Sequence, residues 1–378
     1  MLKDPLKKTV KGSQSNKNKS KSNQYDMIVF CHLRWQFVYQ RPQHIISRMS
    51  KVMKVLMIEE PVDYNQENEN SATILQITDS LHVLQARVSD IPSIANILPN
   101  YITNNNISIG WFYSPSFNSL LTSFNFDTVV YDCMDELSFF KEVPQELINQ
   151  ERELLAQVDI IFTAGKSLYE SKSELHPNVY CLPSSVDESH FAKALNGIAV
   201  AAEISNIQTP IVGYCGVIDH QIDLSLLHET AKLLPNVSFV MVGPLSKITK
   251  EELPQEENIH YLGMRSYNEL PSYLKAFDIA MMPFAINDAT KHLSPSKTLE
   301  YMAAGKPIIS TEITDIIRDY STCVSIIVTA EDFAESITFL LDKRDQLSLQ
   351  MEYHDILKNT SWDATASTMQ SIIAKFAI

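Results

Sequence analysis

The chain of 378 residues is 45% hydrophobic and 20% charged, a composition typical of globular proteins, and its length predicts two domains of ordinary size. Its formal net charge of −14 argues against a general nucleic-acid binder, which needs a basic face to neutralise phosphate. No apolar run approaches the roughly 20 residues that span a bilayer, and residues 1–24 lack the apolar core of a secretory signal. The five cysteines are far apart, without metal-binding spacing, which predicts reduced core residues in a cytoplasmic protein.

Residues 1–24 differ in charge from the rest of the chain. They hold seven Lys and one Asp, a net charge of +6 that leaves −20 for the remainder. Ser, Asn and Gln separate the lysines and few residues are apolar, so we expect a disordered tail. Either it is a solvated linker, or it associates weakly with the anionic inner face of the membrane, where each Lys contributes about 1 kcal/mol.

Residues 25–195 alternate between apolar runs and helical patterns of 10–15 residues. This alternation predicts a parallel sheet with helices on both faces, a Rossmann-like domain. The GxGxxG fingerprint is missing after the first strand, so a dinucleotide site is not expected there. The expected strands cover residues 27–31, 54–58, 72–77, 107–113, 128–133, 159–164 and 179–183.

Polar side chains follow two of these predicted strands. His32 and Arg34 come directly after residues 27–31, and Asp135 follows residues 128–133. Polar groups at the carboxyl end of a parallel strand face the ligand crevice, so we take all three as candidate catalytic residues. Core packing suits the neighbouring aromatic residues better than it suits His32 and Arg34, whereas acidic residues such as Asp135 also cap helices.

Residues 196–209 have weak periodicity and are expected to link the domains. A second strand series fills residues 210–360, and Ser361 is expected to cap a final helix at 361–378 that packs against the body. Gly213 lies in the first strand of this series and Gly216 follows it, and both allow a ligand to approach the backbone. The expected strands cover residues 209–215, 238–243, 259–263, 278–284, 307–311 and 324–329.

The segment LSPSKTLEYMAAGKPIIST, residues 293–311, contains a charge that conflicts with its position. Ser294 reads as an N-cap and Pro295 as the first helical residue, which puts Lys297 in the first turn. The partial positive charge of a helix N-terminus disfavours a cation there unless an anion lies between them, and phosphate would resolve the conflict. Glu300 shares a face with Lys297 and can accept hydrogen bonds from ligand hydroxyls. The alternative is an ordinary surface ion pair, worth about 0.2–0.5 kcal/mol.

SPSKTLEYMAAGKPIIST resembles the donor-nucleotide segment of glycosyltransferase family 4, whose members have the GT-B fold. The resemblance covers roughly residues 27–376 and implies two Rossmann-like domains facing each other across a cleft, with the last helix crossing back to the first domain. Many members have a Glu eight positions before the ribose Glu, where this chain has His292. HLRW and QRPQH resemble a bacterial subgroup that builds cell-surface polysaccharide, teichuronic-acid enzymes included.

The resemblance also implies roles for single residues. Glu300 would bind the nucleotide ribose, Lys297 would face the diphosphate and act in catalysis, and Asp135 would lie close to the transferred sugar. His32 and Arg34 would act on the acceptor or sugar side. The remaining residues expected at the nucleotide-sugar are Gly216, Val217, His220, Met264, Arg265, Ser294, Pro295 and Ser296.

The expected function is transfer of a sugar from a nucleotide-diphosphate donor, a UDP-sugar, to a glycan or lipid-linked acceptor. Lys297 and the helix start would stabilise charge on the leaving diphosphate without an obligatory metal or other cofactor. Membership of family 4 implies retention of anomeric configuration. Two alternatives stay open: a sugar-nucleotide epimerase of the same fold, and a catalytically degenerate binding or scaffold protein.

Overall fold

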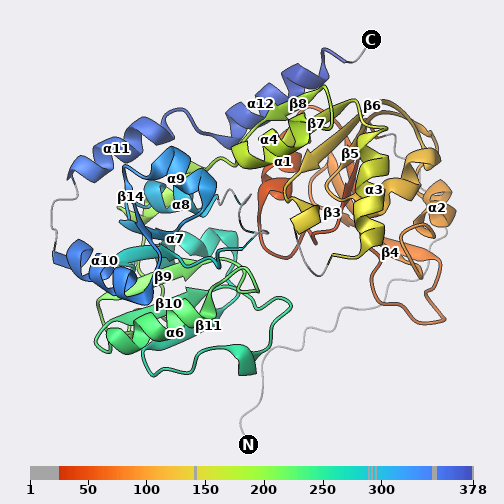
Figure 1. The fold of residues 1–378 in the computed structure, drawn as a ribbon. Coiled ribbons are helices and arrows are strands. Elements are labelled where there is room, and N and C mark those ends of the chain that lie inside the picture. Colours follow the sequence, from red (N-terminus) through yellow and green to blue (C-terminus); the bar gives the residue numbers. More distant parts are fainter. Residues whose placement is uncertain are drawn as a thin grey trace, which may run out of the picture.

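The protein consists of two α/β domains that lie side by side, as the computed structural model shows (Figure 1). The structure describes residues 25–139, 143–287, 290, 293, 296–342 and 347–376. The predicted tail, residues 1–24, lies outside these ranges, as do Ser294 and Pro295. A sheet of mainly parallel strands forms the centre of each domain, which confirms the expected pair of Rossmann-like halves.

The first sheet has eight strands in the order β3-β4-β2-β1-β5-β6-β7-β8. Side chains of β1 alternate between its faces, so Phe30 packs in one core cluster and Val29 in another. The strands are β1 Met27–Cys31, β2 Val55–Glu59, β3 Ser71–Gln76, β4 Leu81–Arg87, β5 Asn106–Phe112, β6 Asn125–Cys133, β7 Ile160–Thr163 and β8 Val179–Cys181. The helical elements are α1 Arg41–Met49, α2 Ile94–Ile97, η1 Leu98–Asn100, η2 Pro115–Ser123, η3 Leu137–Phe139, α3 Gln145–Leu155, α4 Lys166–Ser173, α5 Glu188–Phe191 and η4 Ala192–Ala194.

The second sheet has six parallel strands in the order β11-β10-β9-β12-β13-β14. Its core already includes Val186, Phe191 and Ala194, which precede the predicted linker. The strands are β9 Ile211–Cys215, β10 Ser238–Val242, β11 Ile259–Gly263, β12 Ile279–Met282, β13 Ile308–Thr311 and β14 Val324–Ile327. The helical elements are α6 Leu224–Leu233, η5 Lys250–Glu252, η6 Tyr267–Glu269, α7 Leu270–Leu274, α8 Lys297–Ala303, α9 Thr314–Tyr320, α10 Ala330–Asp342, α11 Leu347–Leu357 and α12 Trp362–Ile373.

One edge of the first sheet departs from the prediction. Strand β4 was not predicted, because His82 and Gln85 interrupt its apolar run. It pairs with β3 antiparallel, so the expectation of a wholly parallel sheet was wrong there. Residues 77–80 alone join the two strands, and a connection this short permits an antiparallel hairpin but no parallel crossover.

The last helix, α12, crosses back to the first domain, as predicted, and packs on α1 (Figure 1). The ring of Trp362 is 2% exposed and stacks on the ring of His44, with their centroids 4.6 Å apart. Ser361 caps the helix, because its hydroxyl accepts a hydrogen bond from the backbone N–H of Ala364 at 3.0 Å. A stacked aromatic pair and a cap therefore fix the start of α12 against α1.

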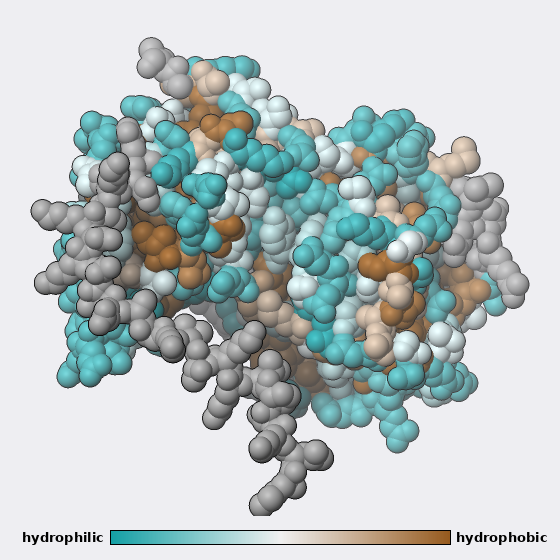
Figure 2. Space-filling view, turned by 180° about the vertical axis from the view of Figure 1, so that it is seen from behind, coloured by the Kyte–Doolittle hydropathy of each residue, from teal (hydrophilic) through white to brown (hydrophobic). Residues whose placement is uncertain are grey.

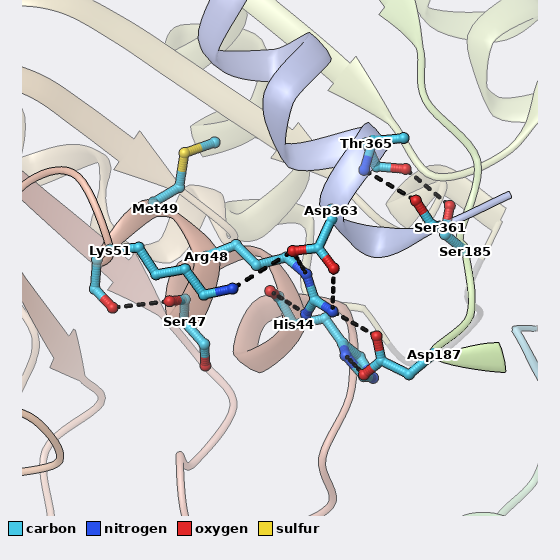
Figure 3. Close-up of polar contacts among 12 residues, drawn as sticks. His44, Ser47, Arg48, Met49, Lys51, Ser185, Asp187, Ser361, Asp363 and Thr365 are labelled. Atoms are coloured by element: carbon cyan, nitrogen blue, oxygen red, sulfur yellow. Dashed lines mark hydrogen bonds and ion pairs between the residues drawn. The ribbon is translucent and has the colours of Figure 1, made fainter. Parts of the chain in front are cut away.

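Polar contacts join the same helices to the segment that leaves the first domain (Figure 3). Arg48 of α1 forms ion pairs with Asp187 and with Asp363, the latter at 3.2 Å. The hydroxyls of Ser185 and Thr365 are 2.8 Å apart. Partial burial raises the pKa of Asp187, but the hydrogen bond from His44 and the charge of Arg48 outweigh it and lower that pKa to about 2.

A further contact between the domains joins α9 to the start of α4. Asp315, which is 3% exposed, accepts hydrogen bonds from the N–H groups of Lys166 at 2.9 Å and Ser167 at 3.2 Å, and from the Ser167 hydroxyl at 2.5 Å. Beside it, Arg318 pairs with Glu170 at 3.0 Å. A carboxylate of the second domain therefore caps a helix of the first.

Two expectations from composition concern the membrane and the cysteines. Within the described ranges no helix is both long and apolar enough to cross a membrane. The five cysteines all lie in these ranges and are free, and four of them are buried. The four buried cysteines lie in the core, as their spacing predicts, and Cys181 is only partly buried.

The capping contact can be tested by removing its carboxylate. We expect Asp315→Ala to lower the free energy of unfolding by about 1–3 kcal/mol, because two N–H groups and a hydroxyl lose their acceptor. Asp319→Ala is the matched control on the same helix, since it removes only the partly exposed pair with Lys166, worth about 0–1 kcal/mol. Chemical denaturation measures both losses, and equal losses would contradict the capping role.

Candidate functional site

Strands β9 and β10 end side by side at two glycines. The N–H of Gly216 donates a hydrogen bond to the carbonyl of Val242 at 2.9 Å. A Cβ atom on Gly243 would lie 1.7 Å from the carbonyl oxygen of Gly216, so no larger residue fits at position 243 unless a strand moves. The Gly216 backbone is thus placed at the carboxyl edge of the sheet, where ligands of open α/β sheets bind.

The side chain of Lys297 crosses Gly216. A Cβ atom on Gly216 would lie 2.1 Å from Cε of Lys297 and 2.5 Å from the hydroxyl oxygen of Tyr214. The structure therefore brings together two predicted site residues that are 81 positions apart in the sequence. The absence of a side chain at position 216 is what leaves room for Lys297.

Helix α8 begins at Lys297, with Ser296 in the N-cap position. The predicted cap Ser294 and the predicted first helical residue Pro295 lie outside the described residues, so that prediction stays a prediction. Ser296 itself has helical backbone angles, and its hydroxyl donates to Oε1 of Glu300 at 3.3 Å instead of accepting from a backbone N–H. The serine thus orients the glutamate that follows it.

Glu300 lies one turn into α8, beside the end of β9. The hydroxyl of Tyr301 accepts a hydrogen bond from the N–H of Cys215 at 2.9 Å, which fixes the helix against the strand. Burial raises the pKa of Glu300 above its ordinary value, although the charge of Lys297 and then the hydrogen bond from Ser296 oppose that rise. Lys297 therefore favours the ionised form of Glu300, which accepts hydrogen bonds from hydroxyls.

His32 and Asp135 follow β1 and β6, whose carboxyl ends lie at the same edge of the first sheet. Burial and then the charge of Lys247 lower the pKa of His32 to about 4, so its imidazole is neutral near pH 7. Its Nδ1 atom is buried without a hydrogen-bond partner. Burial and the charge of Asp219 raise the pKa of Asp135, Lys247 opposes them, and the result is about 6.

Arg34 contacts the chain itself through its guanidinium. Nη2 donates to the carbonyl of Pro61 at 2.8 Å, and Nη1 contacts the carbonyl of Glu60 and, at 3.3 Å, the Glu59 carboxylate. Glu59 also accepts a hydrogen bond from the N–H of Trp35. Arg34 thus joins the loop after β1 to the loop after β2, and its predicted catalytic role stays a prediction.

The other predicted nucleotide contacts lie in three separate places. The carbonyl of Val217 accepts a hydrogen bond from Tyr214 at 2.9 Å, directly after the Gly216 turn. His220 and Met264 are exposed. Arg265 is turned toward residues 196–209, because its guanidinium pairs with Glu203 at 2.8 Å. Met264 and Arg265 follow β11, which neighbours β10 in the sheet, and their predicted contact with the nucleotide stays a prediction.

Sequence reasoning missed Asp219 and Lys247. The segments that carry them are joined by a parallel bridge between Ile218 and Leu245 and by a hydrogen bond from the N–H of Ser246 to the carbonyl of Ile218 at 3.0 Å. Burial raises the pKa of Asp219, and Lys247 is among the groups that lower it. The sequence offered one signal for this region. The glycine of VGP, Gly243, directly follows β10, just as Gly216 directly follows β9.

Charge in this region comes from side chains and from backbone groups. Within the described ranges no three His, Cys, Asp or Glu side chains are arranged to hold a metal ion. The expectation that no metal is required stays a prediction. Among the described residues, Lys247 and Lys297 are cations whose charges act on groups at the ends of β9 and β10.

Comparison with known proteins relates these features to a family. Residues 209–343 match the family Glycosyl transferases group 1. A Bacillus subtilis protein named for teichuronic acid biosynthesis as the glycosyltransferase TuaH is 26% identical over 220 residues. That match covers 54% of this chain and 55% of TuaH, so the chain spans about half the length of the curated relative that it matches.

Solved structures extend the likeness to nearly the whole chain. An α,α-trehalose-phosphate synthase (UDP-forming) from Burkholderia xenovorans in complex with glucose-6-phosphate has a TM-score of 0.69 at 10% identity and covers 92% of this chain and 99% of its own. Anabaena HepE in complex with UDP and glucose has a TM-score of 0.67 at 9% identity, over 93% and 99%. At these identities the likeness establishes the fold. Residues 209–343 therefore resemble the Glycosyl transferases group 1 family, and the chain as a whole has the two-domain GT-B fold.

Proposed function

We propose that this protein is a glycosyltransferase that uses a nucleotide-diphosphate sugar as donor. The observation that carries the proposal is the placement of Lys297 across Gly216, with Glu300 one turn further along α8. A cation at the end of this strand suits a diphosphate, and the carboxylate beside it suits the hydroxyls of a ribose. The family match over residues 209–343 covers this half of the site.

The proposed reaction breaks the bond between the anomeric carbon and a diphosphate oxygen. A new bond forms from that carbon to an acceptor hydroxyl, whose proton is lost, and negative charge grows on the departing diphosphate. Lys297 stabilises this charge from a fixed position across Gly216. His32 and Asp135, at the edge of the first sheet, contact the transferred sugar or the acceptor.

Substrate and setting are proposed from the relatives. UDP is part of the HepE complex and of the synthase name, which supports a UDP-sugar donor. A trehalose-6-phosphate synthase is described as a transferase with retention, which supports retention here. The TuaH name supports a glycan or lipid-linked acceptor in cell-surface polysaccharide synthesis. We extend the proposal to a cytoplasmic enzyme whose Lys-rich residues 1–24 touch anionic membrane.

Incubation of the purified protein with UDP-hexoses and GDP-hexoses tests the proposal. Release of the nucleoside diphosphate with a new glycosidic product supports glycosyl transfer, and the anomeric coupling constant of that product reports its configuration. An epimerised donor would instead identify a sugar-nucleotide epimerase. Binding without turnover, with every donor and with a panel of glycan acceptors, would identify a binding protein.

The role of Glu300 predicts a loss of nucleotide affinity. We expect Glu300→Gln to weaken UDP binding by about 1.5–3 kcal/mol, the size of a hydrogen bond to a charged group, and to leave the melting temperature nearly unchanged. Glu331→Gln, at an exposed Glu of the same domain, is the control and should bind as the unaltered protein does. Isothermal titration calorimetry measures all three. Unchanged affinity in Glu300→Gln would remove Glu300 from the site.

The contact between Lys297 and Gly216 predicts that two substitutions share one effect. Lys297→Ala should lower kcat by roughly 100-fold, the loss that follows removal of one preorganised electrostatic group. Gly216→Ala should lower kcat as well, because the added Cβ displaces the Lys297 side chain. If the glycine acts through the lysine, the double variant should lose no more than Lys297→Ala alone, whereas independent effects would multiply. Steady-state kinetics of the three variants decide between these outcomes.

A further inference from the structure

We propose that Tyr267 of the second domain is a positioning residue for the transfer, because its ring holds the loop after β1, residues 32–40, against the second domain. That loop carries His32, which contacts the transferred sugar or the acceptor in the proposed reaction. The inference rests on the proposed function. It concerns a residue in η6, directly after β11 and outside the expected nucleotide contacts.

The segment that leads into the second domain fixes Tyr267. The imidazole of His190, in α5, stacks on the Tyr267 ring with the centroids 4.3 Å apart and the planes 9° from parallel. Nε2 of the same imidazole donates to the backbone carbonyl of Tyr267 at 2.9 Å. Phe191, a residue of the second core, meets the Tyr267 ring edge-on at 5.5 Å. Helix α5 also contacts α8, so Tyr267 is fixed relative to the helix that carries Lys297 and Glu300.

Residues of the first domain contact the same ring. The ring of Tyr39 lies 4.8 Å from the ring of Tyr267, and the imidazole of His44 meets it edge-on at 5.2 Å. The hydroxyl of Tyr39 lies 3.4 Å from the carbonyl of Gln43 and 3.3 Å from the hydroxyl of Ser47, both in α1. Tyr39 is the next-to-last residue of the loop, and it therefore connects the loop and α1 to the second domain.

Within the first domain, a single side chain accounts for much of the polar contact with this loop. Nε2 of Gln43 lies 3.3 Å from the carbonyls of Arg34 and Trp35 and 3.1 Å from the carbonyl of Val38. An amide group has two hydrogens, so it cannot give a full hydrogen bond to three carbonyls at once. The contact between Tyr39 and Tyr267 therefore adds to the restraint that Gln43 provides.

The ring of Tyr267 carries this contact more than its hydroxyl does. The hydroxyl donates to Oδ2 of Asp187 at 3.3 Å, which is long for a bond between two oxygens, usually about 2.7–2.8 Å. The distance to the Tyr39 ring, by contrast, lies in the range in which aromatic pairs are favourable. Removing the hydroxyl alone should therefore change little, whereas removing the ring should release the loop.

Hydrogen exchange of residues 32–40, measured by mass spectrometry without substrate, tests this contact. The N–H groups of Trp35, Phe37 and Gln40 have hydrogen-bond acceptors, so they exchange when the loop opens locally. Tyr267→Leu should speed their exchange by about 2- to 12-fold, the factor that corresponds to the loss of one aromatic pair.

Two further variants show whether the ring is responsible. Tyr267→Phe keeps the ring and should restore the exchange of the unaltered protein. Tyr261→Leu is the matched control, because Tyr261 is a partly buried tyrosine of β11 whose hydroxyl donates to the carbonyl of Pro254 in its own domain at 3.2 Å. It should leave the exchange of residues 32–40 unchanged. Tyr267→Met fills more of the vacated space and serves if the Leu variant does not fold.

Steady-state kinetics separate a part in the transfer from a structural contact. UDP-glucose is the donor, and the acceptor is the one from the glycan panel that the unaltered protein uses fastest. Tyr267→Leu should raise the KM for this acceptor by roughly 2- to 12-fold, because only the fraction of molecules with the loop in place binds it. The kcat should change less, since Lys297 and Gly216 are not altered. Adding Tyr39→Leu should raise the KM no further, whereas independent effects would multiply.

The outcomes separate the inference from the function on which it rests. Equal exchange of residues 32–40 in Tyr267→Leu and Tyr261→Leu would show that Tyr267 does not hold the loop. Faster exchange with an unchanged KM for the acceptor would overturn the part of Tyr267 in the transfer. Absence of transfer by the unaltered protein, with faster exchange in Tyr267→Leu, would overturn the proposed function and leave the contact between the domains standing.

Discussion

The relative position of the two domains is the constraint on which the site depends, because its residues come from both. Two contacts fix that position at separate places. Trp362 of α12 stacks on His44 of α1, and Asp315 of α9 caps α4. Because the Asp315 carboxylate is buried, rotating the domains apart would leave its partners without an acceptor. Figure 2 shows a recess between the two halves, and these contacts hold its walls in place.

The first domain holds the loop that carries Asp135 in place, and charged groups of the second domain act on the pKa of Asp135. Lys172, whose side chain is 1% exposed, lies 3.0 Å from carboxylate oxygens of both Glu136 and Glu151. Removing one partner from a buried ion network is strongly destabilising, so this network anchors the residue next to Asp135. Burial and then the charge of Asp219 raise the pKa of Asp135, and the charge of Lys247 opposes them. Charged groups of the second domain therefore act on a carboxyl that the first domain holds in place.

Sequence patterns predict the structure of a single short segment, but they miss contacts between segments that are far apart in the chain. Strands such as β1 and β12 are buried along their whole length and were predicted from their continuous apolar runs. Strand β4 was not predicted, because His82 and Gln85 interrupt its apolar pattern. Gly216, Lys297 and Glu300 were identifiable because they lie in two short segments of one domain. Arg34 and Arg265 suggested ligand contacts, yet partners 25 and 62 positions away engage their guanidinium groups. Lys247 itself matched no motif, because the backbone bridge that runs its loop alongside the Asp219 segment is visible only in the fold.

Lys297 shows how the physical argument for a residue changes once its surroundings are known. From the sequence, a cation at a helix start seemed to require a ligand anion. In the folded protein the carboxyl groups of Glu300 and Asp219 already lie within its electrostatic reach, so its charge is balanced by the protein itself. What singles Lys297 out is steric, because its side chain occupies space that any residue other than glycine at position 216 would fill. The pairing of that glycine with that lysine, more than the charge at the helix start, is therefore the feature that sets this strand end apart.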